Sequence, residues 1–195
     1  MKTVGIYGGT FDPIHVGHLT TAQAVCEIRK LDKIIFIPSF VSPHKTDRVS
    51  SSPKHRMNML KLAIEGISSF DYSDLEITNE NISYTIDTVK KLKPIYENIE
   101  LIIGYDNLVT FNTWKEPDEL LKLVKLVVLR RKVTKNKFEQ NKYFNKAIFV
   151  DTPLIEIYGT NIRERVMKEQ SINFLVPQKV MAYIYKHNLY KEKIG

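Results

Sequence analysis

The chain has 195 residues, 43% of them hydrophobic, and a formal net charge of +7. This size supports one good hydrophobic core, so we expect a single domain over residues 1–195 with a C-terminal helical subregion over residues 158–195. No apolar run approaches the roughly 20 residues that span a bilayer, and no signal peptide is expected, so membrane proteins are excluded. The single cysteine, Cys26, excludes an internal disulfide and favours a reducing, cytoplasmic setting.

Short apolar runs alternate with longer segments of helical period along the whole chain. The predicted strands cover residues 3–7, 33–38, 72–77, 100–103, 126–129 and 147–150. The predicted helices cover residues 17–30, 53–67, 84–96, 116–123, 160–168 and 177–187. This alternation predicts an α/β fold, a doubly wound and mostly parallel sheet with helices on both faces. In such a sheet ligands bind beyond the carboxyl ends of the strands, so a functional motif should follow a strand.

The segment after the first predicted strand combines two glycines with two histidines, in the sequence GGTFDPIHVGH over residues 8–18. Gly8 and Gly9 allow a sharp turn and a close approach of the backbone to a phosphate. The N–H groups at the start of the next helix suit the same anion. His15 and His18 would share one face of the first helical turn. Such imidazoles can donate hydrogen bonds to phosphate oxygens and, when protonated, add positive charge where negative charge develops.

Simpler interpretations of this segment exist, because a Gly-Gly pair is a common turn and a lone histidine is usually structural. A metal site would need a third ligand, and none is evident at a suitable spacing. The glycine spacing is not that of a dinucleotide fingerprint, and no Gly-Lys-Ser/Thr follows as in a Walker A loop. The ordered combination of all these features is much harder to obtain by chance.

This segment resembles the GxFDPxHxGH motif of the nucleotidyltransferase superfamily, whose fold is Rossmann-like. The resemblance implies that His15 and His18 are catalytic and contact the phosphates of ATP. The ATP phosphate site that it implies begins with Gly8, Gly9, Thr10, Phe11, His15 and His18.

Further segments are similar to one family, the bacterial nicotinate-nucleotide adenylyltransferases. They are His44-Lys45, Ser83–Thr88, Gly104–Asp106, Trp114-Lys115, Thr160–Arg163 and the C-terminal residues 175–190. The resemblance implies transfer of AMP from ATP to nicotinic acid mononucleotide, with Mg²⁺ held mainly by the ATP phosphates. Nicotinamide mononucleotide and phosphopantetheine are the alternative acceptors within the superfamily. A phosphate acceptor is already anionic, so this reaction needs no general base.

The acceptor site that the resemblance implies comprises Gly9, His44, Lys45, Thr85, Trp114 and Lys115. Trp114 can stack on a pyridine ring, although an ordinary core tryptophan is an equal alternative. Thr85 lies near a predicted helix start, where backbone N–H groups can hold a carboxylate and Ser83 is a candidate N-cap. His44 and Lys45 lie in a Ser- and Pro-rich loop, residues 40–52, that we expect to close over the acceptor.

The remaining ATP contacts implied by the resemblance are Gly104, Asp106, Thr160, Asn161, Ile162 and Arg163. Asp106 can bind ribose hydroxyls or cap the following helix. Arg163 can bind the β- and γ-phosphates in a bidentate manner, or form a surface ion pair.

The chain departs from the family's pattern at two places. The family usually has two serines where this chain has Tyr158 and Gly159, and the loss of a hydroxyl predicts weaker ATP binding. It tends to have Arg-Pro-Gly where this chain has residues 130–132, so the adenine contacts there stay open.

The basic excess lies in the second half of the chain, where residues 130–146 carry seven basic residues and one acidic residue. One interpretation is a positive field near an anionic ligand, and the other is a solvated loop, which we prefer for the distal part. A nucleic-acid patch would have aromatic residues interleaved on a strand face, and Tyr143 and Phe144 alone give it little support. We therefore expect no nucleic-acid partner. A non-catalytic nucleotide-binding module and an NAD-dependent oxidoreductase are the rival functions, and the oligomeric state, with a homo-oligomer among the outcomes, stays open.

Overall fold

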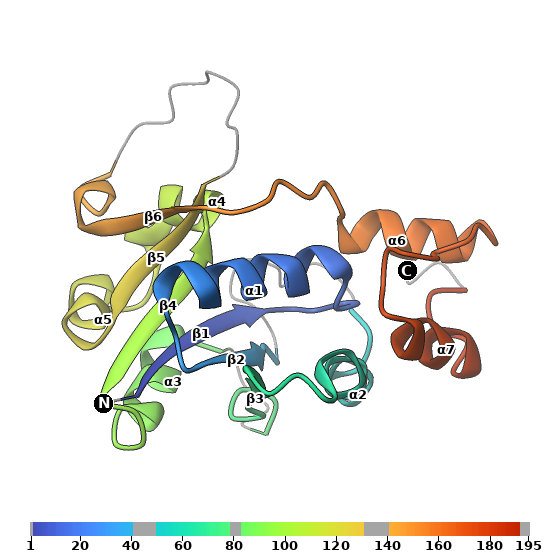
Figure 1. Cartoon of the computed structure of the whole chain (residues 1–195), viewed down its shortest axis with the longest axis horizontal. Coiled ribbons are helices and arrows are strands. Elements are labelled where there is room, and N and C mark those ends of the chain that lie inside the picture. The colour runs from blue at the N-terminus through green and yellow to red at the C-terminus, as the bar shows by residue number, and fades with distance from the viewer. Residues whose placement is uncertain (1, 41–49, 79–82, 131–140, 192–195) are drawn as a thin grey trace.

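The computed structural model describes residues 2–40, 50–78, 83–130 and 141–191. Within these residues six strands form one all-parallel sheet in the order β3-β2-β1-β4-β5-β6 (Figure 1). The strands are β1 (Thr3–Gly9), β2 (Lys33–Pro38), β3 (Phe70–Tyr72), β4 (Asn98–Gly104), β5 (Lys125–Arg130) and β6 (Ala147–Asp151). This sheet confirms the predicted α/β class.

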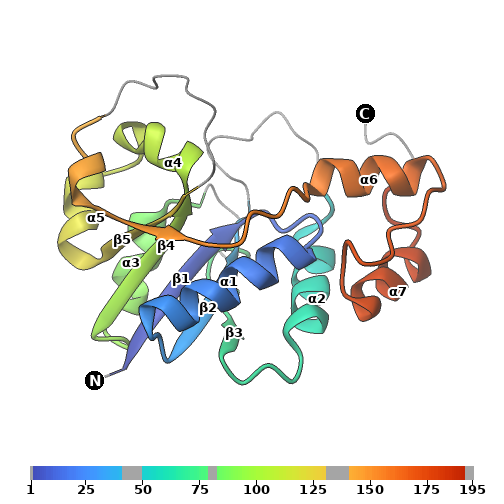
Figure 2. The same ribbon diagram turned by 45° about the horizontal axis from the view of Figure 1, so that its top comes forward.

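Helices cover both faces of the sheet, as the doubly wound prediction requires (Figures 1 and 2). The helices are α1 (Val16–Arg29), α2 (Pro53–Ile64), α3 (Thr85–Leu92), α4 (Tyr105–Val109), α5 (Pro117–Leu123), α6 (Gly159–Met167) and α7 (Gln178–Lys186). Two short 3-10 turns, η1 (Phe111–Thr113) and η2 (Phe144–Lys146), complete the described elements. None of the helices in the described ranges is long and apolar enough to cross a membrane.

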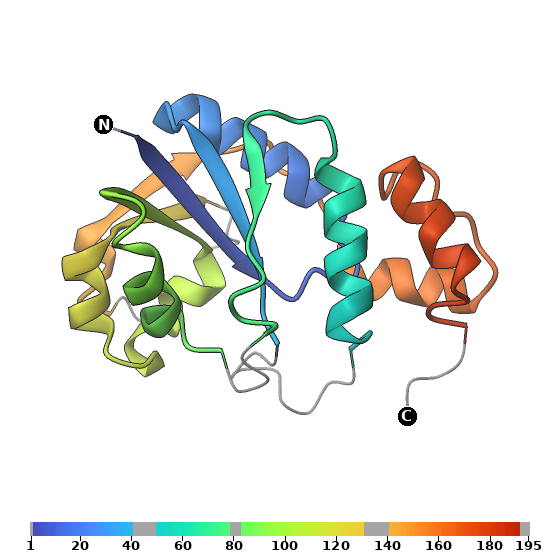
Figure 3. The ribbon, with the colours of Figure 1, turned by 90° about the horizontal axis from the view of Figure 1, so that it is seen from below.

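Two hydrophobic cores form because adjacent residues of a strand point to opposite faces. In β2, Ile34 and Phe36 pack in one core with α1, α2, α6 and α7, whereas Ile35 and Ile37 pack in the other with α3, α4 and α5. Both faces of the strand are thus buried, which explains its uninterrupted apolar sequence. Figure 3 shows α2 between the sheet and α7.

The third predicted strand is wrong in its position. We predicted residues 72–77, but β3 ends at Tyr72, which pairs with Phe36 of β2. Pro38 lies two residues beyond Phe36 and has no N–H group with which to continue the ladder. The chain instead turns, and the N–H group of Thr78 donates to the carbonyl of Asp74 at 3.0 Å.

The helix α4 was not predicted, because five residues are too few to show a helical period. It follows β4 directly and is important for the site. The strand order reverses between β1 and β4, and their carboxyl ends form the switch point at which sheets of this kind bind ligands.

Candidate active site

Two cavities open at the switch point and share one wall. The first, of about 700 Å³, includes His15, His18 and Arg163 in its lining, and we call it the histidine cavity. The second, of about 190 Å³, includes Trp114 and Thr85, and we call it the tryptophan cavity. The residues common to both linings lie at the carboxyl ends of β1 and β4 or shortly after them: Gly8, Gly9, Thr10, Ile103 and Asn107.

The glycines of the shared wall have different reasons to be glycine. A Cβ atom built on Gly9 would lie 3.0 Å from Cζ of Phe11, so a side chain there would press on that buried ring. A Cβ atom built on Gly8 would meet no heavy atom within 4 Å. Protein packing therefore does not require glycine at position 8, and the open space above it suits a ligand that approaches the backbone closely.

The two histidines stack on each other at the start of α1, with ring centroids 3.6 Å apart. His15 is the N-cap residue, and its Nδ1 accepts a long hydrogen bond, 3.4 Å, from the N–H group of His18. Nδ1 of His18 accepts from the N–H group of His15 at the same distance. An imidazole nitrogen that accepts carries no proton, so each neutral ring has its proton on Nε2, which can donate to a phosphate oxygen.

Burial changes the charge state expected of His15. The residue is 6% exposed, and burial lowers its pKa from 6.5 to about 4. The ring is therefore neutral at neutral pH in the protein without substrate. Of the two roles open to an imidazole here, hydrogen-bond donor or positive charge, this state favours the donor.

The far wall of the histidine cavity comes from the start of α6. Arg163 donates from Nη1 to the backbone carbonyl of Asp12 at 2.6 Å and from Nη2 to Oγ1 of Thr160 at 3.3 Å. Its Nη1 also lies 4.0 Å from the Asp12 carboxylate. Arg163 therefore faces the segment between β1 and α1, residues 10–15, which we call the phosphate loop. Its ion-pair partner is Asp12 of this loop, so the alternative of a surface ion pair with a glutamate is wrong.

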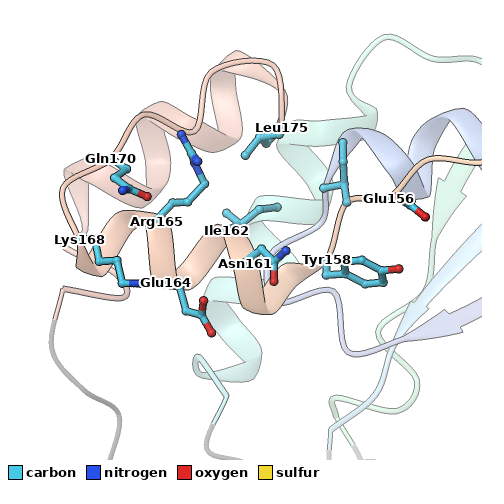
Figure 4. A pocket seen from close by; sticks show the side chains of 10 residues that line it. Glu156, Tyr158, Asn161, Ile162, Glu164, Arg165, Lys168, Gln170 and Leu175 are labelled. Atoms are coloured by element: carbon cyan, nitrogen blue, oxygen red, sulfur yellow. The ribbon is translucent and has the colours of Figure 1, made fainter.

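The other predicted ATP residues divide into two groups. Gly104 and Asp106 line the histidine cavity, and Asp106 lies in the first turn of α4, whose N-cap residue is Gly104. The side chains of Asn161 and Ile162 do not line this cavity. Ile162 is buried in the core, and both residues line a separate hollow of about 340 Å³ between α6 and the segments that precede and follow it (Figure 4).

Trp114 lies in the wall of the tryptophan cavity, half-buried, with its ring 5.0 Å from that of Phe111. Both alternatives for Trp114, a core residue and a residue that faces a ligand site, thus hold in part. One part of the indole packs on the core, and another part faces the cavity. Lys115, beside it, forms an ion pair with Asp87 at 2.9 Å and lies 4.9 Å from the Tyr84 ring centroid. His44 and Lys45 lie outside the described residues.

The start of α3 forms another part of this cavity, but Ser83 does not cap it. The N-cap residue is Tyr84, whose side chain makes no capping hydrogen bond, and Thr85 is the first helical residue. Oγ of Ser83 instead accepts from the N–H group of Phe40 at 3.1 Å. Ser83 thus joins the end of β2 to the start of α3.

Sequence reasoning missed Glu76, a half-buried acid that lines the tryptophan cavity. Its Oε1 accepts a hydrogen bond from Oγ1 of Thr88 at 2.7 Å. Burial raises the pKa of Glu76, while hydrogen bonds from Thr88 and Ser83 oppose this rise. Glu76 follows β3 at some distance and belongs to no motif, so the sequence carries no signal for it.

The histidine cavity also has lining residues that the strand rule alone could have found. Leu129 and Arg130 end β5, and residues 152–155 follow β6, at the carboxyl ends of the strands. The following residues, Arg131 and Lys132, lie outside the described part of the chain.

Known proteins show which family shares this arrangement. The profile of the Cytidylyltransferase-like family matches residues 6–165. Two proteins described as probable nicotinate-nucleotide adenylyltransferases are similar over nearly the whole chain. The Clostridium novyi protein is 40% identical over 98% of this chain and 100% of its own length, and the Thermoanaerobacter sp. protein is 43% identical over 97% and 94%. The chain belongs to the nicotinate-nucleotide adenylyltransferase family.

A solved structure supports the same fold for this family member. The Plasmodium falciparum nicotinic acid mononucleotide adenylyltransferase, complexed with NaAD, aligns with a TM-score of 0.79 over 100% of both chains. At 22% sequence identity this likeness shows the fold.

At position 159 the chain has glycine where the family's pattern has serine. The structure gives a steric reason for this glycine. A Cβ atom at position 159 would lie 2.9 Å from the carbonyl oxygen of Asp12 and 3.4 Å from Nη1 of Arg163. Glycine therefore allows Arg163 to reach the carbonyl of Asp12.

The described residues offer few ligands for a metal ion. Across the described ranges, no three His, Cys, Asp or Glu side chains form a group that could hold a metal ion. The lining of the histidine cavity has two carboxylates, Asp12 and Asp106. Asp12 is buried and accepts hydrogen bonds from Ser51 and Tyr190, whereas Asp106 is exposed. One carboxylate fits a hydrated cation that takes its other ligands from phosphates.

Proposed function

We propose that this chain transfers AMP from ATP to nicotinic acid mononucleotide, giving nicotinic acid adenine dinucleotide and pyrophosphate. The observation that carries the proposal is the pair of cavities that meet over Gly8–Thr10. The histidine cavity is large and has polar and charged groups that suit a triphosphate, whereas the tryptophan cavity is narrow and suits a flat ring. Membership in the family supports the same reaction.

ATP would occupy the histidine cavity. His15 and His18 would donate from Nε2 to oxygens of the α-phosphate, where charge develops during transfer. Arg163 would leave or share its contact with Asp12 to bind the β- and γ-phosphates, and Thr160 would assist it. The backbone of Gly8–Phe11 would approach the phosphates, and Asp106 would receive the ribose hydroxyls or a hydrated cation. Asn161 and Ile162 are not in the lining of this cavity, so neither is assigned a side-chain contact with ATP.

The acceptor would occupy the tryptophan cavity. Its pyridine ring would stack on Trp114, and its carboxylate would meet the N–H groups at the start of α3, beside Thr85. Gly9 would lie under the acceptor phosphate, and Lys115 would add positive charge at the cavity rim. His44 and Lys45 stay candidates for the acceptor phosphate.

The chemistry is a direct in-line displacement. An oxygen of the acceptor phosphate attacks the α-phosphorus of ATP, and the bond to the β-phosphate oxygen breaks to release pyrophosphate. The acceptor is anionic at neutral pH, so the protein contributes position and charge stabilisation and no general base. Mg²⁺, bound to the phosphates and water, would neutralise part of their charge. Asp106 is the described side chain that would hold its hydration shell.

We also propose that residues 1–195 act as one domain, with residues 158–195 completing it. Tyr190 supports this, because its hydroxyl donates to Oδ1 of Asp12 at 2.6 Å, across the whole length of the chain. A reducing cytoplasm is the compartment we propose, and Cys26 is free and buried.

Pyrophosphate release tests the proposed function. The purified chain should release pyrophosphate from ATP and Mg²⁺ fastest with nicotinic acid mononucleotide, compared with nicotinamide mononucleotide and phosphopantetheine at equal concentrations. Faster release with either of the other two would assign a different acceptor. No release with any of them, together with salt-sensitive binding of oligonucleotides, would favour a non-catalytic binding module.

A further inference from the structure

A buried arginine lies behind the two cavities. Arg56 of α2 is 0% exposed, and its guanidinium donates to four backbone carbonyls. The acceptors are Ser51 at 3.0 Å, Thr10 at 2.9 Å, Ser39 at 2.7 Å and Phe40 at 3.1 Å. The side chain itself lines neither cavity. Burial lowers the pKa of Arg56 and the nearby Asp12 raises it, so a charge is kept in the interior by carbonyl dipoles and one carboxylate.

The carbonyls that Arg56 holds belong to the walls of both cavities. Thr10 is part of the shared wall, Ser39 lines the tryptophan cavity, and Phe40 lines the histidine cavity. The N–H group of Ser39 also donates to the carbonyl of Gly9 at 3.0 Å. The N–H group of Phe40 continues the connection to Ser83. One planar group thus sets the separation of the phosphate loop and the end of β2.

Asp12 is the acidic member of a buried cluster that it forms with Arg56, Ser51 and Tyr190. Its Oδ2 accepts from the N–H group of Ser51 at 3.1 Å, so Ser51 is held by Arg56 on one side and Asp12 on the other. Its Oδ1 accepts from Tyr190, which lies outside both cavity linings. The cluster therefore ties the phosphate loop to the C-terminal residues as well as to β2.

We infer that Arg56 is a positioning residue for catalysis, which holds the donor and acceptor walls at the separation that in-line transfer needs. The inference rests on the proposed function. A planar guanidinium can bond several carbonyls in fixed directions, whereas the ammonium of lysine is a compact charge with fewer donors. Misplacement of reacting groups by about 1 Å can lower a rate about 100-fold, even when the changed residue is far from the chemistry.

The test compares Arg56→Lys with a matched substitution, Arg29→Lys. Arg29 makes a two-fold hydrogen-bonded ion pair with Glu100, at 2.9 and 2.7 Å, near the amino ends of the strands and away from both cavities. Both variants should melt at lower temperature. Arg56→Lys should lower kcat by about 100-fold with little change of either KM, since it alters the alignment of bound substrates. Arg29→Lys should keep kcat within about two-fold of the wild type.

Thermal unfolding curves from circular dichroism show the temperatures at which each variant is folded, and the rates are measured at such a temperature. A folded Arg56→Lys variant with the kcat of the wild type would overturn the inference, and so would an equal loss of kcat in Arg29→Lys. If Arg56→Lys does not fold at any temperature, Tyr190→Phe decides. It removes the hydroxyl that bonds Asp12 and leaves the ring in place, and it should lower kcat several-fold with unchanged KM values, whereas wild-type kcat would overturn the inference. A wild-type chain that releases no pyrophosphate overturns the proposed function itself, before any variant is compared.

Discussion

The histidine cavity and the tryptophan cavity share a wall, but their linings consist of different kinds of residue. The histidine cavity, of about 700 Å³, is formed by helix starts and loops that carry imidazole, carboxylate and guanidinium groups. The tryptophan cavity, of about 190 Å³, is floored by strand residues of the core such as Ile6, Ile37 and Leu101. We propose from this difference that one cavity binds the phosphates of ATP and the other binds the flat ring of the acceptor.

The largest expected effect is on the histidine cavity. His18→Ala should lower kcat by about 10²–10³-fold, the usual result of removing one donor that stabilises developing charge. His15→Ala should act in the same direction and should also remove the cap of α1. The matched control is His187→Ala, because the His187 ring packs at a tilt against Tyr183, with centroids 4.2 Å apart, and lines neither cavity. Near-normal turnover of both cavity variants would break the assignment of this cavity to ATP.

The second prediction concerns the charge state of His15. Its pKa is 6.5 in the unfolded chain and about 4 in the fold. Between pH 4 and pH 6.5 the imidazole of His15 is protonated in the unfolded chain but not in the folded protein. The free energy of unfolding should therefore fall as the pH falls from 6.5 to 4, by about 1.4 kcal/mol per pH unit and about 3 kcal/mol in total.

Urea unfolding over this pH range, for the wild type and for His15→Gln, measures the contribution. The variant should lose this part of the acid dependence. Glu76 of the tryptophan cavity should change the stability in the opposite direction. Because its pKa is raised in the fold, its contribution to the free energy of unfolding should decrease as the pH rises. An NMR titration that shows a protonated His15 ring at pH 6 would contradict the neutral donor.

The third prediction concerns the tryptophan cavity alone. Trp114→Ala should raise the KM for nicotinic acid mononucleotide by about tenfold, because an aromatic pair contributes roughly 0.5–1.5 kcal/mol beyond its buried area. The KM for ATP should change little. Trp114→Phe keeps a flat ring and should recover most of the loss. Equal effects on both KM values would show that the two cavities do not separate their substrates.

The smallest effect is expected at Gly159. Gly159→Ser adds a Cβ atom 2.9 Å from the Asp12 carbonyl, which should cost about 1 kcal/mol of stability and raise the KM for ATP a few-fold. Gly159→Ala adds the Cβ atom without a hydroxyl, and it should have the same effects as Gly159→Ser. A lower KM for ATP in Gly159→Ser, but not in Gly159→Ala, would instead support the missing hydroxyl as the limiting feature.

The sequence predicted those parts of the molecule that are encoded locally. The apolar runs placed five of the six strands within two residues at each end, and the histidine segment is contiguous, so its residues meet in one helical turn. β3 was misplaced because its end depends on Pro38 of a neighbouring strand. The expected cap at Ser83 was wrong because its hydroxyl has a partner 43 residues away, Phe40.

The features that could not be predicted depend on long-range packing. Arg56 looks like a surface helix residue in the sequence, and only the fold brings four carbonyls around it. Glu76 lies outside every motif, and its hydrogen bond with Thr88 forms because the fold brings α3 against it. The neutral state of His15 likewise follows from burial, which residue spacing does not specify.

A crystal structure with nicotinic acid adenine dinucleotide bound tests the division between the two cavities most directly. We predict the AMP half in the histidine cavity, with the diphosphate over Gly8–Thr10 within hydrogen-bond distance of His18. We predict the pyridine ring against Trp114, with its carboxylate at the start of α3. A pyridine ring in the histidine cavity, or a dinucleotide bound away from Gly8–Thr10, would contradict this account.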